Sequence, residues 1–166
     1  MTRRLLAFTL CALLLCAICH AEEAPFAPVR TPDVEAADGH ELSAYYGKDI
    51  ALAAEALGGL TFSAGEEFRE NYIGDAVALR GEDGVITYIE LRDAPGDYTL
   101  CGISVGMARE DALALMEGCP KLWDYDEEVA WIVRADAQNE LNDETLVVFF
   151  DEDGRVNGAW YRVSAA

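Results

Sequence analysis

The stretch 148-VFFDEDGRVNGAWYRV-163 consists of two apolar segments separated by Glu152-Asp153-Gly154. Asp-Gly between apolar runs is the strongest short signal for a β-hairpin, because the tight turn needs residues that tolerate positive φ. A second stretch, 78-ALRGEDGVITYIEL-91, has the same arrangement around Glu82-Asp83-Gly84. The two stretches predict two hairpins at corresponding places of an internal repeat.

A short amphipathic helix is predicted before each hairpin. The segment 47-GKDIALAAEALGG-59 places Ile50, Ala53, Ala54 and Leu57 on one helical face and ends at two glycines. The segment 106-GMAREDALALMEGCP-120 groups Ala112, Leu113 and Met116, and its Gly and Pro form a stop signal. A further strand is expected at 128-EVAWIVRA-135, with Trp131 in the core.

This order of elements indicates an α+β fold, because the strand–helix alternation that builds parallel sheets is missing. We expect two helix-plus-antiparallel-strand repeats that form one sheet, with the helices packed on one face. The chain is predicted to divide into a signal peptide (1–21), a flexible acidic linker (22–43) and a tandem domain (44–166). Within that domain, repeat one covers 44–97 and repeat two covers 98–166.

The N-terminus has the features of a secretory signal peptide. Arg3 and Arg4 precede an apolar run from Leu5 to Ile18, and cleavage is expected after Ala21. Lipoprotein anchoring is a weaker alternative, because large apolar residues precede the cysteines of this segment. The protein is therefore expected to be secreted or held in the cell envelope.

The charge of the chain restricts its partners. There are 12 Lys and Arg against 31 Asp and Glu, which gives a formal net charge of −19. Such an acidic surface repels nucleic acid and anionic membranes. We therefore expect no nucleic-acid partner and no membrane insertion after signal removal.

The motif Gly102-Ile103-Ser104-Val105-Gly106 has the G-x-S-x-G form of a hydrolase nucleophile turn. A serine nucleophile needs a base, which in these hydrolases is a histidine later in the chain. The two histidines, His20 and His40, both precede Ser104. Ser104 is therefore interpreted as part of a structural turn, and no catalytic residue is predicted.

The cysteines are candidates for a disulfide, and the acidic clusters are candidates for a metal site. Cys101 and Cys119 remain after signal removal, and two cysteines in an exported chain suggest one disulfide, with two buried thiols as the alternative. The acidic segments 124-DYDEE-128 and 151-DEDG-154 lack the ligand spacing of an EF-hand. No metal and no cofactor are predicted.

Strand alternation gives a candidate binding surface. In the first hairpin Val85, Thr87, Ile89 and Leu91 are expected to face the core, whereas Ile86 shares the other row. In the last strand Ala159, Tyr161 and Val163 are expected to be buried. The predicted binding surface on the open sheet face consists of Tyr88, Glu90, Arg92, Trp160 and Arg162. Exposed aromatic residues beside arginine are typical anchors of protein interfaces.

The second half of the chain resembles a known family. Residues Gly106-Met107, Arg109-Glu110-Asp111, Leu113, Leu115, Gly118 and Pro120 are similar to the Gly-Met-x-x-Glu-[Glu/Asp] helix signature of SmpA/OmlA domains, and the β-lactamase-inhibitor protein shares that unit. The aromatic residues Trp123 and Tyr125 and the stretch 149–156 fit the rest of the pattern, over about residues 100–163. Ala108 stands where the signature has a capping Thr or Ser. The resemblance implies tandem units, export and function by binding, without catalytic residues.

The leading hypothesis is an exported, non-enzymatic protein-binding or scaffold module, whose partner is an unknown protein in the envelope or extracellular space. A more specific variant is an inhibitor of a secreted enzyme, with the turns at 82–84 and 152–154 as insertion loops. Two alternatives from other classes remain: a secreted hydrolase that uses a carboxylate pair, and a protein that binds calcium or a small ligand.

Overall fold

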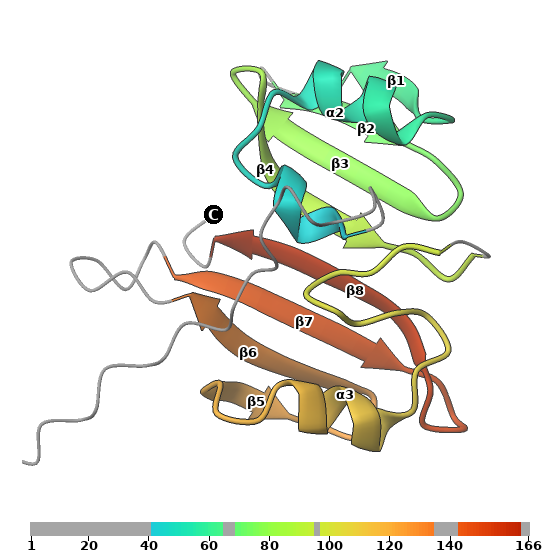
Figure 1. The fold of residues 1–166 in the computed structure, drawn as a ribbon, viewed down its shortest axis with the longest axis vertical. Helices are drawn as coiled ribbons and strands as arrows, with labels where there is room; N and C mark the ends of the chain where they lie inside the picture. Colours follow the sequence, from blue (N-terminus) through green and yellow to red (C-terminus); the bar gives the residue numbers. More distant parts are fainter. Residues whose placement is uncertain (1–40, 65–68, 95–96, 135–142, 164–166) are drawn as a thin grey trace, which may run out of the picture.

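The computed structural model describes residues 41–64, 69–94, 97–134 and 143–163, which form one eight-stranded antiparallel sheet with short helices on one face (Figure 1). The elements in chain order are η1 (Leu42–Tyr45), α2 (Ile50–Leu57), β1 (Thr61–Ala64), β2 (Arg69–Ile73), β3 (Val77–Glu82), β4 (Val85–Leu91), α3 (Arg109–Leu115), β5 (Lys121–Asp124), β6 (Glu128–Arg134), β7 (Glu144–Phe150) and β8 (Val156–Val163). The predicted α+β class with an antiparallel sheet is confirmed.

The sheet order is β1-β2-β3-β4-β8-β7-β6-β5. Within β1–β4 and within β5–β8, successive strands pair antiparallel, whereas β4 pairs with β8, and not with β5, at the centre of the sheet. There Tyr88 lies opposite Arg162, and Glu90 lies opposite Trp160. Two segments far apart in the sequence are thereby brought side by side in the middle of the molecule (Figure 1).

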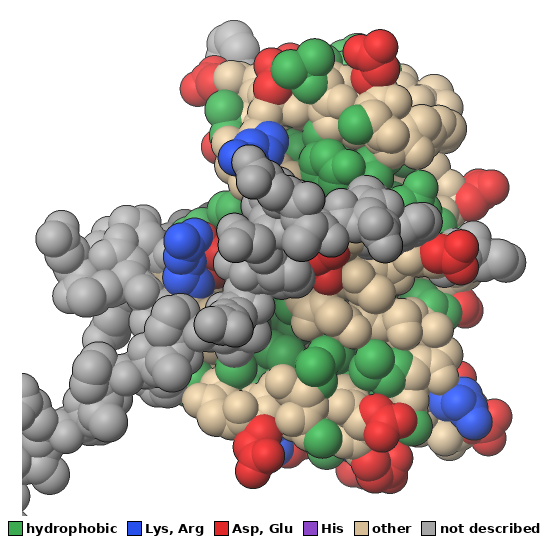
Figure 2. Space-filling view, viewed as in Figure 1, with side chains coloured by type: hydrophobic (Ala, Val, Ile, Leu, Met, Phe, Trp, Pro, Cys, Tyr) green, Lys and Arg blue, Asp and Glu red, His purple; other side chains and the backbone are tan. Residues whose placement is uncertain are grey.

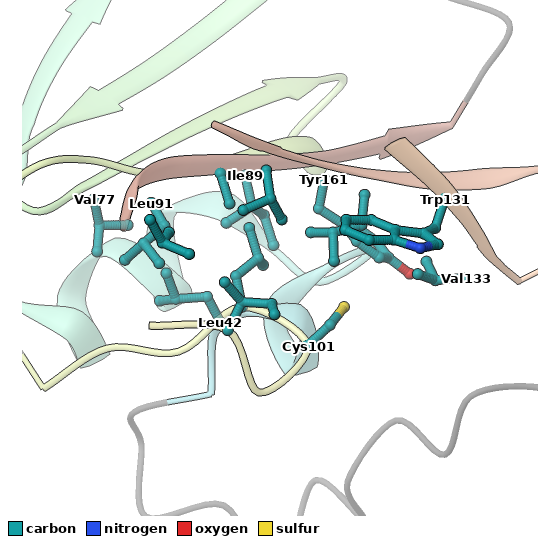
Figure 3. Close-up of a cluster of buried hydrophobic side chains, with 14 of the residues drawn as sticks. Leu42, Val77, Ile89, Leu91, Cys101, Trp131, Val133 and Tyr161 are labelled. Atoms are coloured by element: carbon teal, nitrogen blue, oxygen red, sulfur yellow. The ribbon is translucent and has the colours of Figure 1, made fainter. Parts of the chain in front are cut away.

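The hydrophobic core lies between the sheet and the helical layer. Leu42 of η1, Ile50 of α2 and Met116 just after α3 all bury their side chains against it. Figure 3 shows Trp131 and Tyr161 beside one another in this core, with Ile89 and Leu91 farther along the sheet. The predicted core positions that are buried are Ile50, Ala53, Ala54, Ile89, Leu91, Ala112, Met116, Trp131, Ala159 and Tyr161. On this helix-bearing side, Asp and Glu side chains are spread around the edge of the molecule (Figure 2).

The two predicted hairpin turns differ from each other. The first is a two-residue turn in which both Asp83 (φ 53°) and Gly84 (φ 78°) have positive φ. In the second only Gly154 (φ 70°) does, because the turn is longer: Asp151 donates its N–H to the Arg155 carbonyl. The Asp151 carboxylate accepts bonds from the backbone N–H groups of Asp153 and Arg155, which fixes that longer loop.

A β-bulge corrects the predicted faces of the first hairpin. Arg80 pairs with Tyr88, but the next pair is Gly81 with Ile86, so Thr87 is an extra residue in β4. Ile86 is therefore buried at 1% exposure, whereas Val85 is 42% exposed. The prediction for these two residues was wrong, while the alternation from Tyr88 onward holds.

The folded region begins earlier than the predicted linker boundary at residue 43. Glu41, Leu42 and Ser43 are buried, and the Leu42 N–H donates to the Thr99 carbonyl at 2.8 Å. These residues belong to the fold because they are buried against the segment 97–103 and hydrogen-bond to it. The signal peptide, its cleavage position Ala21 and the rest of the predicted linker lie outside the described residues.

The predicted disulfide is wrong, because Cys101 and Cys119 are both free thiols. Cys101 and Gly102 (φ 53° and 79°) form a two-residue turn, across which Leu100 and Ile103 exchange backbone hydrogen bonds. The Cys101 thiol points into the core (Figure 3), where burial and the neighbouring Glu41 charge raise its pKa. Burial also raises the pKa of the Cys119 thiol, which is half-buried beyond α3.

Ser104 does not lie at a strand-to-helix elbow. The helix α3 begins only at Arg109, and between them Gly106 (φ 81°) donates its N–H to the Val156 carbonyl at 2.7 Å. The segment is a connection that passes the first residue of β8 before it enters the helix. This geometry agrees with the interpretation of Ser104 as part of a structural turn.

Candidate functional site

The face of the sheet opposite the helices brings together all five residues of the predicted surface. Tyr88 and Glu90 come from β4, and Trp160 and Arg162 come from β8 in the neighbouring register positions. Arg92 follows β4 directly and reaches back to Glu90, with 3.7 Å between Arg92 Nε and Glu90 Oε1. All five side chains are partly exposed. Their placement on one face follows from the β4–β8 pairing, and their role remains a hypothesis.

On this face two stacked aromatic rings are each in contact with a guanidinium group. The Tyr88 and Trp160 rings are stacked, with centroids 6.2 Å apart and an interplanar angle of 28°. The Arg80 guanidinium lies 4.5 Å from the centre of the Tyr88 ring, and that of Arg162 lies 4.7 Å from the Trp160 ring. Each contact is a cation–π interaction, worth about 0.5–1 kcal/mol at exposed sites. We call Arg80, Tyr88, Glu90, Arg92, Trp160 and Arg162 the arginine–aromatic face.

Glu90 connects the members of this face. Its carboxylate lies 3.6 Å from Arg80 Nη2 and 3.7 Å from Arg92 Nε. The Tyr88 hydroxyl donates to Glu90 Oε2 at 3.4 Å. Burial and the Glu90 charge raise the pKa of Tyr88 to about 12, so its hydroxyl remains a hydrogen-bond donor at neutral pH. Arg92 is fixed further because its Nη1 donates to the Gly74 carbonyl at 3.0 Å.

Two hollows border the Tyr88 ring. The smaller, of about 170 Å³, is lined by Arg69, Arg80, Gly81, Glu82, Thr87, Tyr88 and Arg162. The larger, of about 560 Å³, is lined by Arg80, Tyr88, Glu90, Leu91, Arg92, Asp93, Phe149, Asn157, Gly158, Ala159 and Trp160. Because Arg80 and Tyr88 line both, the two hollows form neighbouring compartments of one surface.

Arg69, Arg80 and Phe149 were missed by the sequence interpretation. Counting back from the Asp83-Gly84 turn pairs Arg80 with Thr87, and only the bulge at Thr87 moves Arg80 opposite Tyr88, so the hairpin sequence did not reveal that residue. The position of Arg69 on β2 depends on the pairing of Arg69 with Glu82, whose side chains form an ion pair at 3.3 Å. Phe149 pairs with Gly158 in the β7–β8 hairpin, and it reaches the site because β8 pairs with β4.

Beyond Trp160 the side chains on this side of the sheet are apolar and buried. The row that begins with Glu90 and Trp160 continues across the sheet through Val147, Ala130 and Trp123. Val147 and Ala130 are fully buried, and neither belongs to the main core. The polar arginines and an apolar strip therefore lie next to one another on the same side of the sheet.

The acidic segments considered for calcium are engaged in protein contacts. Asp124 pairs with Arg109 at 2.7 Å and with Lys121 at 2.6 Å, and these two cations lower its pKa. Within the described ranges, no three His, Cys, Asp or Glu side chains converge as a metal-binding group would. In the same part of the chain, no helix has both the length and the hydropathy needed to cross a membrane.

Comparison with known proteins gives a likeness in fold. No protein-family model matches the chain, and no curated protein matches it in sequence. An extracellular protein containing an SCP domain from Bacillus anthracis has a similar structure, with a TM-score of 0.53 and 9% identity over 82% of this chain and 50% of that one. A cysteine-rich secretory protein from Staphylococcus aureus has a TM-score of 0.49 and 12% identity over 74% of this chain and 46% of that one. The chain thus spans about half the length of each of these proteins.

These findings correct the resemblance to SmpA/OmlA domains and the β-lactamase-inhibitor protein. The structural neighbour with a TM-score of 0.53 is an extracellular protein containing an SCP domain, and no family model supports the signature. The quoted residues describe a short helix with acids in its first turn and Gly and Pro after it. Those features satisfy general requirements of helix ends, so they recur in unrelated chains. At such low identity the likeness concerns the fold alone.

Proposed function

We propose that the protein is an exported, non-enzymatic protein-binding or scaffold module whose contact surface is the arginine–aromatic face. The observation that carries the proposal is the stack of Tyr88 on Trp160, flanked by the guanidinium groups of Arg80 and Arg162. Trp, Tyr and Arg are the residues that dominate the binding energy of protein interfaces. Here they are partly exposed, held in place and bordered by hollows.

A tandem repeat would explain where this face lies. Each proposed repeat consists of a helix and four antiparallel strands, α2 with β1–β4 and α3 with β5–β8. Glu90 and Trp160 are separated in sequence by the same interval as Asp83 and Asp153, and they lie opposite one another in the sheet. This is the arrangement expected if a two-fold relation between the repeats passes between β4 and β8. The contact surface would then lie at the junction of the repeats.

Two observations support export. The N-terminal sequence has the basic, apolar and small-residue segments of a signal peptide. The structural neighbours are described as secretory and extracellular proteins. We therefore place the function outside the cytoplasm, either in the envelope or in the extracellular space.

The carboxylates near the face favour binding over hydrolysis. Glu82 is paired with Arg69, and Glu90 is paired with both Arg80 and Arg92. A hydrolytic carboxylate pair needs one acid that carries a proton and one free base. Glu82 and Glu90 are each engaged by guanidinium groups and do not face one another as such a pair.

A capture experiment tests the proposal. The full chain, purified after export, is immobilised and exposed to envelope and secreted fractions of the producing cells. Retained proteins are identified, and their affinity is measured for the wild type and for Tyr88→Ala/Trp160→Ala. Removing two central rings of an interface is expected to weaken a specific partner at least thirtyfold.

The control variant is Phe62→Ala/Tyr125→Ala, which removes two exposed rings elsewhere, at 54% and 62% exposure. It should bind the partner as the wild type does. Equal binding by Tyr88→Ala/Trp160→Ala, shown to be folded by its near-ultraviolet circular dichroism, would exclude this face as the contact surface.

A further inference from the structure

The smaller hollow is rich in guanidinium groups. Arg69, Arg80 and Arg162 line it together with the single carboxylate of Glu82. The charged side chains that line the hollow therefore sum to +2, in a molecule whose formal net charge is −19. Positive charge is thus concentrated at this place on the sheet.

The ion pairs that these three arginines make within the described residues engage few of their N–H donors. Arg69 Nε faces Glu82 at 3.3 Å, and Arg80 Nη2 faces Glu90 at 3.6 Å. Arg162 Nε is buried without a hydrogen-bond partner among the described residues, so it is not itself open to a ligand. A guanidinium carries five N–H donors in a planar fork that matches the two oxygens of a carboxylate. The hollow therefore offers a binding place for a carboxylate group.

The local charge favours an anionic group. Glu90 does not line the smaller hollow, and its carboxylate is shared between Arg80 at 3.6 Å and Arg92 at 3.7 Å. It therefore offsets only part of the positive charge of Arg80, and the lining of the hollow remains positive. A carboxylate would partly neutralise that charge, and its two oxygens match the planar guanidinium fork.

The larger hollow has a different character. Trp160 and Phe149 provide aromatic walls, and between them lies the buried Gly158, where an added Cβ would come within 3.2 Å of the Leu91 carbonyl oxygen. Its volume of about 560 Å³ can hold a large side chain. The lining also includes the charged side chains of Glu90, Arg92 and Asp93. An aromatic side chain fits this compartment because its ring can pack on Trp160 and Phe149 while polar groups bind its neighbours in the same peptide.

From these features we infer that the arginine–aromatic face binds an acidic, aromatic-containing peptide segment of a protein partner, with a carboxylate in the smaller hollow and an aromatic or large apolar side chain in the larger one. In an extended peptide, side chains two residues apart lie on the same side, roughly 7 Å from each other. The two compartments share Arg80 and Tyr88 as a common wall, so neighbouring side chains of one peptide segment can enter both. Because the rest of the surface is acidic, such a segment would be attracted here and repelled elsewhere. The inference rests on the proposed function and specifies the chemistry of the partner.

Selection from a displayed library of random dodecapeptides tests the inference. The full exported chain is the target, and recovered peptides are synthesised and their Kd values measured. We expect enrichment of Asp or Glu two residues from an aromatic residue. Arg80→Gln should weaken binding at least tenfold, because one charge-assisted contact is lost. Arg69→Gln, at an exposed position on β2, should weaken it as well while leaving the fold intact.

The matched control is Lys48→Gln, which removes one positive charge from an exposed position outside both hollows. It should leave Kd unchanged. Replacing the Glu or Asp of a recovered peptide by Gln or Asn should cost about as much as Arg80→Gln, and combining both changes should cost little more, because they remove the same contact.

Three results would overturn the inference. Peptides without acidic residues that bind Arg80→Gln normally but lose affinity with Tyr88→Ala/Trp160→Ala would leave the proposed function standing and refute the acidic specificity. No enrichment over an empty support would refute a peptide partner. Binding of oligogalacturonate at these arginines, seen as shifts of their Nε resonances, in the absence of peptide binding would assign the face to an anionic polysaccharide.

Discussion

At the scale of single residues, the most constrained side chain is Glu41. Its carboxylate accepts five hydrogen bonds, from the backbone N–H groups of Ser43, Cys101 and Gly102 and from the hydroxyls of Ser43 and Thr99, at 2.6–3.0 Å. Burial alone would raise the pKa of this acid, but the hydrogen bonds outweigh it and lower the pKa. Glu41 thereby ties the start of the fold to the turn at Cys101-Gly102.

We expect Glu41→Gln to destabilise the protein by about 2–4 kcal/mol, because the amide group places a donor where the carboxylate accepts backbone N–H bonds. Urea unfolding at neutral pH measures the change. The control is Glu55→Gln, which alters an exposed carboxylate on α2 and should change the free energy of unfolding by less than about 0.5 kcal/mol. A loss for Glu41→Gln no larger than for Glu55→Gln would contradict the role of this network.

The same residue gives a pH dependence. The pKa of Glu41 is lower in the folded than in the unfolded chain, so its stabilisation is fully present above the unfolded value of about 4.3 and disappears as pH falls through the folded value. Between about pH 5 and pH 3 the wild type should therefore lose more stability than Glu41→Gln does. Parallel curves would show that Glu41 does not contribute to acid unfolding.

At the scale of elements, α3 lacks a side-chain cap. Ala108 has the extended conformation of an N-cap residue (φ −67°, ψ 147°), and its side chain makes no capping hydrogen bond. By contrast, Asp49 caps α2 by accepting from the Leu52 N–H at 2.9 Å. The sequence correctly indicated the missing cap at Ala108, because a methyl group cannot accept a hydrogen bond.

We expect Ala108→Ser to raise the free energy of unfolding by about 0.5–1.5 kcal/mol, since the new hydroxyl can accept from a free N–H of the first turn. Thermal unfolding measures the gain. Ala114→Ser serves as the control, because it introduces the same hydroxyl at an exposed position inside the helix, where it should be neutral or slightly destabilising. A destabilised Ala108→Ser protein would show that the first turn of α3 cannot use a cap.

At the scale of the whole molecule, the β4–β8 pairing joins the two halves of the sheet into one. Ile89 pairs with Tyr161 at this seam, and both side chains lie in a single core cluster that also contains residues of η1, α2 and the segment after α3. The two halves therefore share buried surface. We expect them to unfold together rather than as independent units.

Native-state hydrogen exchange tests this cooperativity. Ile89→Ala should lower the opening free energy of the most protected amides in both β3 and β7 by the same amount, about 2–4 kcal/mol. Leu52→Ala, at a residue that is 67% exposed, is the control and should change neither half appreciably. A loss confined to β3 would mean that the two halves unfold separately.

The sequence by itself determined the local features. Asp-Gly pairs placed both hairpins, apolar spacing placed both helices, and period-two alternation directed Tyr88, Trp160 and Arg162 away from the core. These signals were readable because each depends on residues close together in the chain. The family signature failed for the same reason, since helix-end chemistry is local and common to many folds.

Only the tertiary structure decided how those features combine. The bulge at Thr87 follows from the fit of β3 to β4, and the free state of Cys101 follows from the direction of its turn into the core. The juxtaposition of Tyr88 with Trp160, and of Arg69 with Arg162, depends on which strands meet at the centre of the sheet. Strand order is set by the burial of one shared core rather than by any short segment. The sequence could therefore propose which residues face away from the core, but not which of them contact one another or what else lines the site.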